Sequence, residues 1–194
     1  MYNRVAENSV IASLNGFNSC LLCYGQTGSG KTYTMFGPTE EEEKEKFYFY
    51  KVMENGGIVL RACQQLIEAK DSIRGVSIHL SMEYCQIYQN KITCLLSGNM
   101  VRLRKARGAH LEGTKCVEMT NLDQVLELLK EGEKRKRYAS TAMNMHSSRA
   151  HTVMKINLTQ RRCDTGSFVE STLMLVDLAG SEQVLSFSLL SISL

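Results

Sequence analysis

The feature that most constrains this chain is a glycine-rich segment near its start. Residues 25–32 read Gly-Gln-Thr-Gly-Ser-Gly-Lys-Thr and fill every fixed position of the phosphate-loop pattern G-x-x-x-x-G-K-[ST]. An apolar run precedes the segment and helix-compatible residues follow it, which is the strand–loop–helix order that the motif requires. Inward-turned backbone N–H groups and a helix N-terminus together favour an anion. The segment therefore predicts a nucleoside triphosphate site, and the alternative is a flexible glycine turn.

Two polar segments further along the chain fit the same kind of site. Residues 144–149 read Asn-Met-His-Ser-Ser-Arg and follow a helix-like stretch. Asp177 directly follows the apolar strand-like run 171–176. A carboxylate at the end of such a strand, beside a phosphate loop, is where these NTPases hold the Mg²⁺ shell. The Asp-x-x-Gly spacing then places the backbone N–H of Gly180 near a γ-phosphate.

Taken together and in this order, the three segments resemble the nucleotide motifs of the kinesin motor domain. The resemblance runs from about Tyr2 to Glu182 and includes residues 14–18 and 81–88, the latter similar to the family's S-x-x-E-I-Y-N-E strand. We therefore expect residues 1–182 to be a partial motor domain and residues 183–194 to be a divergent tail. The resemblance does not assign a subfamily, a direction of movement, a cargo or an oligomeric state.

The resemblance implies ATP and Mg²⁺ as cofactors and a Mg²⁺-dependent ATPase activity in the complete form. It implies a phosphate cradle made of Gly25, Gln26, Thr27, Gly28, Ser29, Gly30, Lys31 and Thr32. It implies Mg²⁺ coordination by Thr32 and Ser148, with Asp177 holding a Mg²⁺-bound water. Asn144 and Ser147 would border the γ-phosphate and the attacking water. Tyr33 either packs against the adenine or is simply a residue of the first helical turn.

The remaining residues of the implied site act in catalysis and closure. Lys31 would supply the counter-charge to the phosphates, and the Gly180 N–H would sense the γ-phosphate. Arg149 and Glu182 match the positions of the family's salt bridge between its two switch loops. Glu182, reached through water, would also help to accept the proton. The expected chemistry is positioning and charge stabilisation of a loose phosphoryl-transfer transition state.

The chain also departs from the family pattern. The family begins upstream with a strand that ends in an Arg-x-Arg-Pro-like adenine clamp, and the single proline here is Pro38. Gln183 stands where the family has an arginine, and the family continues there into its main microtubule-binding region. The alternating serine and aliphatic residues of 183–194 indicate an exposed, aggregation-prone strand. We expect unpaired sheet edges and marginal stability from a chain that lacks those parts.

Composition indicates one globular domain. The chain has 194 residues, 43% of them hydrophobic, and a net charge of +3, which gives no nucleic-acid signal but suits an acidic polymer partner. The resemblance implies microtubules, bound weakly by this fragment, and a place in the cytoplasm on the cytoskeleton. The basic segment 102–107 aligns with a family loop that touches tubulin, or it is a solvated loop. No secretory signal or membrane-span pattern is visible, so no membrane partner is expected.

The periodicity predicts an α/β fold, in which a central sheet is flanked by helices on both faces. Helices are expected over 4–15, from Gly30 onward, over 58–69 and over 121–138; strands over 18–24, 76–88, 151–162 and 168–176, with an irregular pair within 101–119. The acidic run 40–46 is expected to be a solvated surface loop. The only C-x-x-C, Cys20 and Cys23, is interpreted as core thiols rather than a zinc or redox site. The basic tetrad 134–137 either complements a helix C-terminus or is a nuclear-localisation signal.

Two other functions stay open at this point. A GTP-binding switch shares the phosphate loop and Asp-x-x-Gly, but the guanine-reading Asn-Lys-x-Asp should follow them. The only Asn-Lys, at Asn90 and Lys91, precedes Asp177 and lacks the Asp. A non-motile product that binds nucleotide or a partner is the second alternative.

Overall fold

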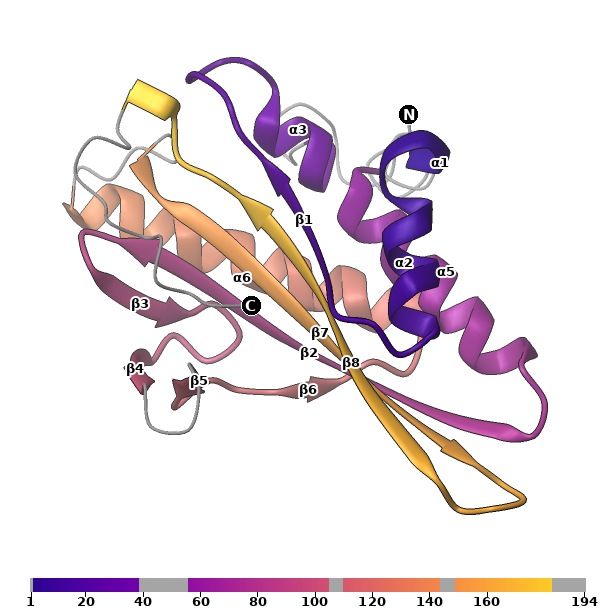
Figure 1. Ribbon diagram of the computed structural model, residues 1–194. Coiled ribbons are helices and arrows are strands. Elements are labelled where there is room, and N and C mark those ends of the chain that lie inside the picture. The colour runs from indigo at the N-terminus through magenta and orange to yellow at the C-terminus, as the bar shows by residue number, and fades with distance from the viewer. Residues whose placement is uncertain (1, 39–55, 105–109, 144–148, 183–194) are drawn as a thin grey trace.

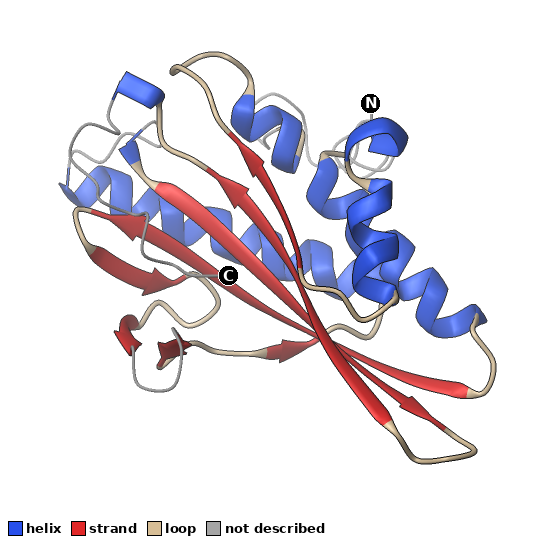
Figure 2. Ribbon diagram, viewed as in Figure 1, coloured by secondary structure: helices blue, strands red, loops and turns tan. Residues whose placement is uncertain are grey.

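The computed structural model describes residues 2–38, 56–104, 110–143 and 149–182. Its strands are β1 (Ser19–Cys23), β2 (Val76–Tyr88), β3 (Lys91–Cys94), β4 (Met100–Arg104), β5 (His110–Glu112), β6 (Val117–Glu118), β7 (His151–Arg162) and β8 (Phe168–Asp177). Its helices are α1 (Tyr2–Val5), α2 (Glu7–Leu14), α3 (Lys31–Phe36), α5 (Ile58–Ser72) and α6 (Leu122–Met143). The strands form one sheet in the order β1-β8-β7-β2-β3-β4-β5, and β6 pairs with β2 (Figures 1 and 2).

The centre of the sheet is built from three long strands that pair antiparallel. β7 lies between β2 and β8, and β1 adds to the outer edge of β8 in parallel. Alternate side chains of the three strands point to one face because successive residues of a strand face opposite sides. On that face the buried side chains are Leu80, Met82, Tyr84, Met154, Ile156, Leu158, Leu173 and Leu175. Burial of each aliphatic side chain contributes about 1.5–3 kcal/mol, so this face is the core.

The described helices cover that one face as a single layer. α5 contacts α2, α3 and α6, and α1 contacts α2, which is possible only where no sheet lies between them. Figure 2 shows the helices on the same side of the sheet. The expected central sheet with flanking helices is confirmed. Within the described residues, however, helices lie on one face only, and the expectation of helices on both faces is corrected to that extent.

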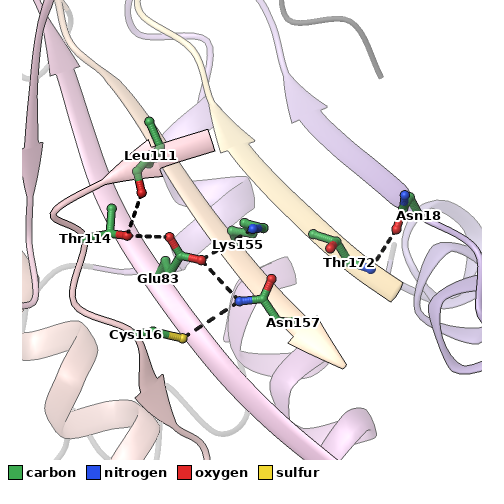
Figure 3. A network of polar contacts seen from close by, with 8 residues as sticks. All are labelled: Asn18, Glu83, Leu111, Thr114, Cys116, Lys155, Asn157 and Thr172. Atoms are coloured by element: carbon green, nitrogen blue, oxygen red, sulfur yellow. Dashed lines mark hydrogen bonds and ion pairs between the residues drawn. The ribbon is translucent and has the colours of Figure 1, made fainter. Parts of the chain in front are cut away.

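The opposite face of the sheet is partly open and carries a polar network (Figure 3). Near the sheet edge, Leu22 is 59% exposed and Cys20 is exposed. Towards the middle, the nearly buried carboxylate of Glu83 accepts hydrogen bonds from Thr114 Oγ1 at 2.7 Å and Asn157 Nδ2 at 3.2 Å. Lys155 Nζ lies 3.4 Å from the same carboxylate. This network ties the segment between β5 and β6 to β2 and β7.

Most of the expected elements are observed, although the helix expected over 4–15 is two helices, α1 and α2. Three strands match within a residue, at 76–88, 151–162 and 168–177, and the hairpin turn between the last two is confirmed. The Asn121 cap is also confirmed, since Asn121 Oδ1 accepts the Gln124 N–H at 2.9 Å. The irregular pair expected within 101–119 is three short strands, and the four-residue β3 was not expected. The acidic run 40–46 and the tail 183–194 lie outside the described residues.

Gly132 provides a test of how closely α6 packs on the sheet. A Cβ at this position would overlap the ring of the fully buried Tyr84 on β2. We expect Gly132→Ala to lower the free energy of unfolding by about 1–2 kcal/mol, because overpacking outweighs the better helix propensity of alanine. Thermal denaturation measures this as a Tm lower by roughly 2–8 °C. Lys134→Ala, on an exposed position of the same helix, is the control, and a stabilised Gly132→Ala variant would contradict the packing.

Candidate functional site

The phosphate loop has the conformation that its sequence requires. It leaves β1 at Cys23 and enters α3 at Lys31, as expected. Gly28 and Gly30 have φ of +80° and +85°, a left-handed conformation that favours glycine. Lys31 Nζ folds back over the loop and donates to the Gln26 carbonyl oxygen at 2.8 Å. The loop is exposed to solvent on its outer side, so a phosphate group can reach it.

Asp177 lies directly beside this loop. It ends β8 and is the register partner of Cys23, the last residue of β1. Its Oδ2 accepts a hydrogen bond from Thr32 Oγ1 at 2.7 Å, although 145 residues separate the two in sequence. The Oδ1 atom is buried and has no hydrogen-bond partner in the described part of the chain. A carboxylate oxygen in this position, beside a threonine hydroxyl, fits the oxygen ligands that Mg²⁺ or its bound water requires.

The electrostatics of Asp177 reflect that position. Burial raises the pKa of the Asp177 carboxyl, while the Thr32 hydroxyl and the cations of Lys136 and Lys31 lower it. Burial is the larger effect, so the pKa lies above its ordinary value. A charged group held in a partly desolvated place at a net electrostatic cost is typical of functional sites.

The segment that follows Asp177 returns to the phosphate loop. The Leu178 N–H donates to the Cys23 carbonyl at 3.2 Å, and the Ser181 N–H donates to the Gly25 carbonyl at 3.0 Å. Glu182 accepts hydrogen bonds from the Thr27 N–H at 3.2 Å and from the Thr27 hydroxyl. The Thr27 hydroxyl is also the main reason why the pKa of Glu182 lies below its ordinary value. A side chain at Gly180 would collide with both Thr27 Oγ1 and the Glu182 carboxylate, so this contact depends on glycine there.

The other expected switch residues are only partly placed. Asn144, Ser147 and Ser148 lie outside the described residues. Arg149 is described and exposed, and in the described part of the chain no ion pair joins it to Glu182. The glutamate contacts Thr27 instead. The Arg149–Glu182 salt bridge therefore stays a prediction.

His151 is a site residue that sequence reasoning missed. It begins β7 and is buried, and its Nδ1 accepts the Ala179 N–H at 3.0 Å. Burial lowers the pKa of the imidazole, and the nearby Asp177 partly offsets that effect. A neutral ring with an unprotonated Nδ1 can accept this hydrogen bond, so His151 fixes the backbone between Asp177 and Gly180. The one sequence feature that could have indicated His151 is its position two residues after Arg149.

Lys136 is the second missed residue. Its Nζ lies 4.5 Å from the centroid of the Phe36 ring at the end of α3 and 5.2 Å from that of Tyr84. It also lies 2.5 Å from Glu133 Oε1, which accepts the Tyr84 hydroxyl at 3.0 Å. Cation–π contacts and a charged hydrogen bond thus join the phosphate-loop helix to α6 and β2.

The basic tetrad 134–137 is therefore not the helix C-terminus that one interpretation placed there. α6 continues to Met143, seven residues beyond Lys136. Within the tetrad, Arg135 donates to the Leu95 carbonyl at 2.7 Å and Lys134 pairs with Glu131. The described cations of this stretch support the packing of α6 rather than its end. The nuclear-localisation alternative remains untested.

The sequence and the fold of this chain both match those of kinesin motors. The family model of the kinesin motor domain matches residues 1–188. The kinesin heavy chain of Syncephalastrum racemosum is 34% identical over 174 residues, which are 87% of this chain and 18% of that protein. Kinesin-like protein 3 of Schizosaccharomyces pombe is 34% identical over 183 residues, 92% of this chain and 31% of that protein. A solved structure, described as that of a fast kinesin, superposes with a TM-score of 0.82 at 31% identity and covers 94% of this chain and 50% of the solved chain.

The chain belongs to the kinesin motor domain family. This is a family of nucleotide-binding microtubule motors, so the resemblance drawn from the motifs is confirmed. The chain spans less than a third of the length of these two curated kinesins and half of the solved one. Among the described helices, none is long and apolar enough to cross a membrane.

The structure also places three further groups of residues that carried a sequence-based expectation: Tyr33, the two cysteines of β1 and the basic segment 102–107. Tyr33 is 57% exposed on the first turn of α3, where it is available to a base or to solvent. Cys20 is exposed and Cys23 is partly buried, so the interpretation of both as core thiols is wrong for Cys20, which faces the open side of β1. Of the basic segment 102–107, the described Arg104 pairs with Glu112 at 2.7 Å. The rest of the segment from residue 105 lies outside the described residues.

Asp177 provides a test that separates a functional carboxylate from a structural one. We expect Asp177→Asn to leave the Tm of the nucleotide-free protein unchanged or higher, because a buried charge is removed while an oxygen remains for Thr32. The same variant should lose about 10–100-fold of the Mg²⁺ contribution to nucleotide affinity. Thermal denaturation, and fluorescent-nucleotide titrations in Mg²⁺ and in EDTA, measure the two effects. The exposed Asp164→Asn is the control; a large fall in Tm with unchanged Mg²⁺ dependence would make Asp177 a structural residue.

Proposed function

We propose that this chain binds ATP with Mg²⁺ and forms the nucleotide-hydrolysing part of a kinesin-type microtubule motor. The observation that carries the proposal is the Thr32–Asp177 contact beneath the phosphate loop, with Asp177 Oδ1 buried and without a partner. In phosphate-loop NTPases the equivalent hydroxyl and carboxylate hold the metal shell. Membership of the kinesin family supports ATP over GTP.

The residues of the loop would bind and orient the phosphates. The N–H groups of residues 25–32 would surround the phosphates, and the Lys31 ammonium would leave the Gln26 carbonyl to meet the β- and γ-phosphates. Thr32, Ser148 and, through water, Asp177 would hold Mg²⁺, which when bound neutralises charge on the phosphate oxygens. Asn144 and Ser147 would place the attacking water.

Glu182 would take part in both closure and proton transfer. In the described state its carboxylate is held by Thr27, on the phosphate loop itself. We infer that the Gly180 N–H would bind a γ-phosphate and that this segment would then move toward Arg149. Glu182 would exchange Thr27 for the Arg149 guanidinium and would accept the proton through water. His151 would keep residues 177–180 in place during this exchange, since it binds the Ala179 N–H.

Lys31 gives the direct test of the catalytic assignment. In the complete motor, we expect Lys31→Ala to lower Mg²⁺-dependent ATP turnover at least about 100-fold, because a preorganised charge on the transition state is lost. Steady-state phosphate release measures it, with Lys134→Ala, an exposed lysine on α6, as the control. Wild-type turnover in the Lys31→Ala motor would overturn the assignment.

A non-motile nucleotide-binding role is the second candidate for the 194-residue chain by itself. This candidate concerns residues 1–194 alone, which cover half of the solved kinesin chain. In this candidate, nucleotide binding as proposed above is retained and movement is not. The two candidates share the site and differ in microtubule affinity.

Microtubule co-sedimentation distinguishes the two candidates. We expect the 194-residue chain to pellet weakly and to be released by added salt. The Arg104 cation is already paired with Glu112, and attraction between exposed charges is screened beyond about 8 Å at physiological ionic strength. Pelleting assays across a range of KCl concentrations, with ATP and with ADP, measure this. Tight, nucleotide-dependent pelleting at physiological salt would instead favour a functional motor surface within this chain.

A further inference from the structure

Two buried cysteines lie side by side on neighbouring strands, away from the phosphate site. Cys85 of β2 and Cys94 of β3 are register partners in the antiparallel ladder, and they are 2% and 0% exposed. Partners in such a ladder place their side chains on the same face of the sheet. For this pair it is the face that carries Glu83, two residues before Cys85 (Figure 3). Tyr84, which contacts Glu133 of α6, lies on the opposite, helix-covered face.

The backbone hydrogen bonds show that this pair is the closely spaced kind. The next pair along the ladder, Tyr84 and Leu95, is joined by the Leu95 N–H to the Tyr84 carbonyl at 2.7 Å. The Cys94 N–H points away from β2 and donates to the Asn99 carbonyl at 2.8 Å. Cys85 and Cys94 are therefore a non-hydrogen-bonded pair, whose Cα atoms lie about 4.5 Å apart in such ladders. That separation is within the range of about 4.4–6.8 Å that a disulfide spans.

The surroundings of the two sulfur atoms differ. Burial by itself would raise the pKa of the Cys94 thiol, but hydrogen bonds from the Ser97 hydroxyl and from the N–H groups of Lys115, Leu96 and Ser97 bring it below its ordinary value. The Lys115 N–H lies 3.4 Å from the Cys94 sulfur. Burial, together with the neighbouring Cys94, raises the pKa of Cys85 to about 12. Cys94 therefore loses its proton more readily than Cys85.

We propose that Cys85 and Cys94 form a reversible disulfide when the protein meets hydrogen peroxide. The Cys94 thiolate attacks the peroxide O–O bond, which gives a sulfenic acid and releases hydroxide. The Cys85 sulfur then attacks the sulfenic sulfur, loses its proton and displaces water. In total the two thiols lose two electrons and two protons, and the peroxide is reduced to two molecules of water. Residues 85–94 then become a closed loop that spans the β2–β3 turn.

Access to the pair depends on a short irregular segment rather than on the helical layer. Residues 113–116, between β5 and β6, lie over this face of the sheet. The Thr114 hydroxyl donates to Glu83 at 2.7 Å (Figure 3). The Lys115 N–H donates to the Cys94 sulfur at 3.4 Å. Connecting segments generally open locally at a lower free energy than the sheet beneath them. Local opening of residues 113–116 would admit a molecule as small as hydrogen peroxide to Cys94.

The other cysteines of the chain provide internal controls. Cys20 and Cys23 form the only C-x-x-C, but they lie on opposite faces of β1 because their positions in the strand differ by three. A disulfide between them would require β1 to unfold. Cys63 on α5 is fully buried like Cys94, and burial raises its pKa to about 12, so it controls for burial without activation.

The test is native oxidation of the full chain carrying Cys20→Ser, Cys116→Ser and Cys163→Ser, which removes the exposed thiols. Hydrogen peroxide is added over a time course, free thiols are alkylated, and proteolytic peptides are weighed. We expect a linked peptide pair containing Cys85 and Cys94, lighter by two hydrogens, with Cys23 and Cys63 still alkylated. Dithiothreitol should reverse the link, and the oxidised protein should have the higher Tm.

Two single variants then test the order of the chemical steps. Cys85→Ala should leave Cys94 as a sulfenic acid that dimedone traps, while Cys94→Ala should leave Cys85 alkylated. Circular dichroism shows whether each variant is folded. Detection of the linked peptide in the parent chain does not depend on either variant. The proposal is overturned if peroxide leaves both Cys85 and Cys94 as free thiols. It is equally overturned if Cys20 and Cys23 link as readily in the wild-type chain.

Discussion

The phosphate site depends on one pairing, that of β1 with β8. It is the parallel pair among the described strand pairs, and it brings the carboxyl ends of both strands to the same edge of the sheet. Because Cys23 and Asp177 are partners there, the loop after β1 and the segment after β8 start from adjacent positions. The contacts Thr32–Asp177, Ser181–Gly25 and Glu182–Thr27 all follow from this start. In open α/β sheets, ligands bind at such carboxyl-end crevices.

This arrangement places the Asp177 carboxylate in a partly buried position, where its charged form is less stable than in water. A cation on the helix-covered side of the sheet offsets part of that desolvation. The carboxylate is partly desolvated and keeps one oxygen without a partner. Lys136 lowers its pKa from beneath, and Lys136 is itself held by two aromatic rings and Glu133. The core beneath the phosphate loop therefore contains the charge of Asp177, which makes folding of the nucleotide-free protein less favourable. A stability cost that persists in this way is expected where a bound ligand uses the charge.

The sequence was most informative where local chemistry determines structure. Glycines with fixed spacing, period-two apolar runs and an asparagine cap each indicate a local conformation, so the phosphate loop, β2, β7, β8 and the start of α6 could be predicted. The order of the motifs also indicated that Asp177 lies near Thr32. Lys136 could not be assigned in that way. Its role depends on Phe36 and Tyr84, which lie on two other elements, and the basic run around it is equally typical of a helix end. The four-residue β3 is too short to show a period.

Strand register explains why the spacing of cysteines in the sequence does not indicate which of them are neighbours. Cys20 and Cys23 look like a reactive pair, yet an odd spacing on a single strand separates them to opposite faces. Cys85 and Cys94 show no motif, yet a turn of suitable length makes them partners. The same alternation sends Tyr84 to the helical side, toward Glu133 and Lys136, and Cys85 to the other side. A disulfide between Cys85 and Cys94 would thus constrain β2, whose Tyr84 contacts Phe36 of the phosphate-loop helix α3, but it would not contact the phosphate loop itself. Oxidation is therefore expected to change the stability of the protein more than its contacts with nucleotide.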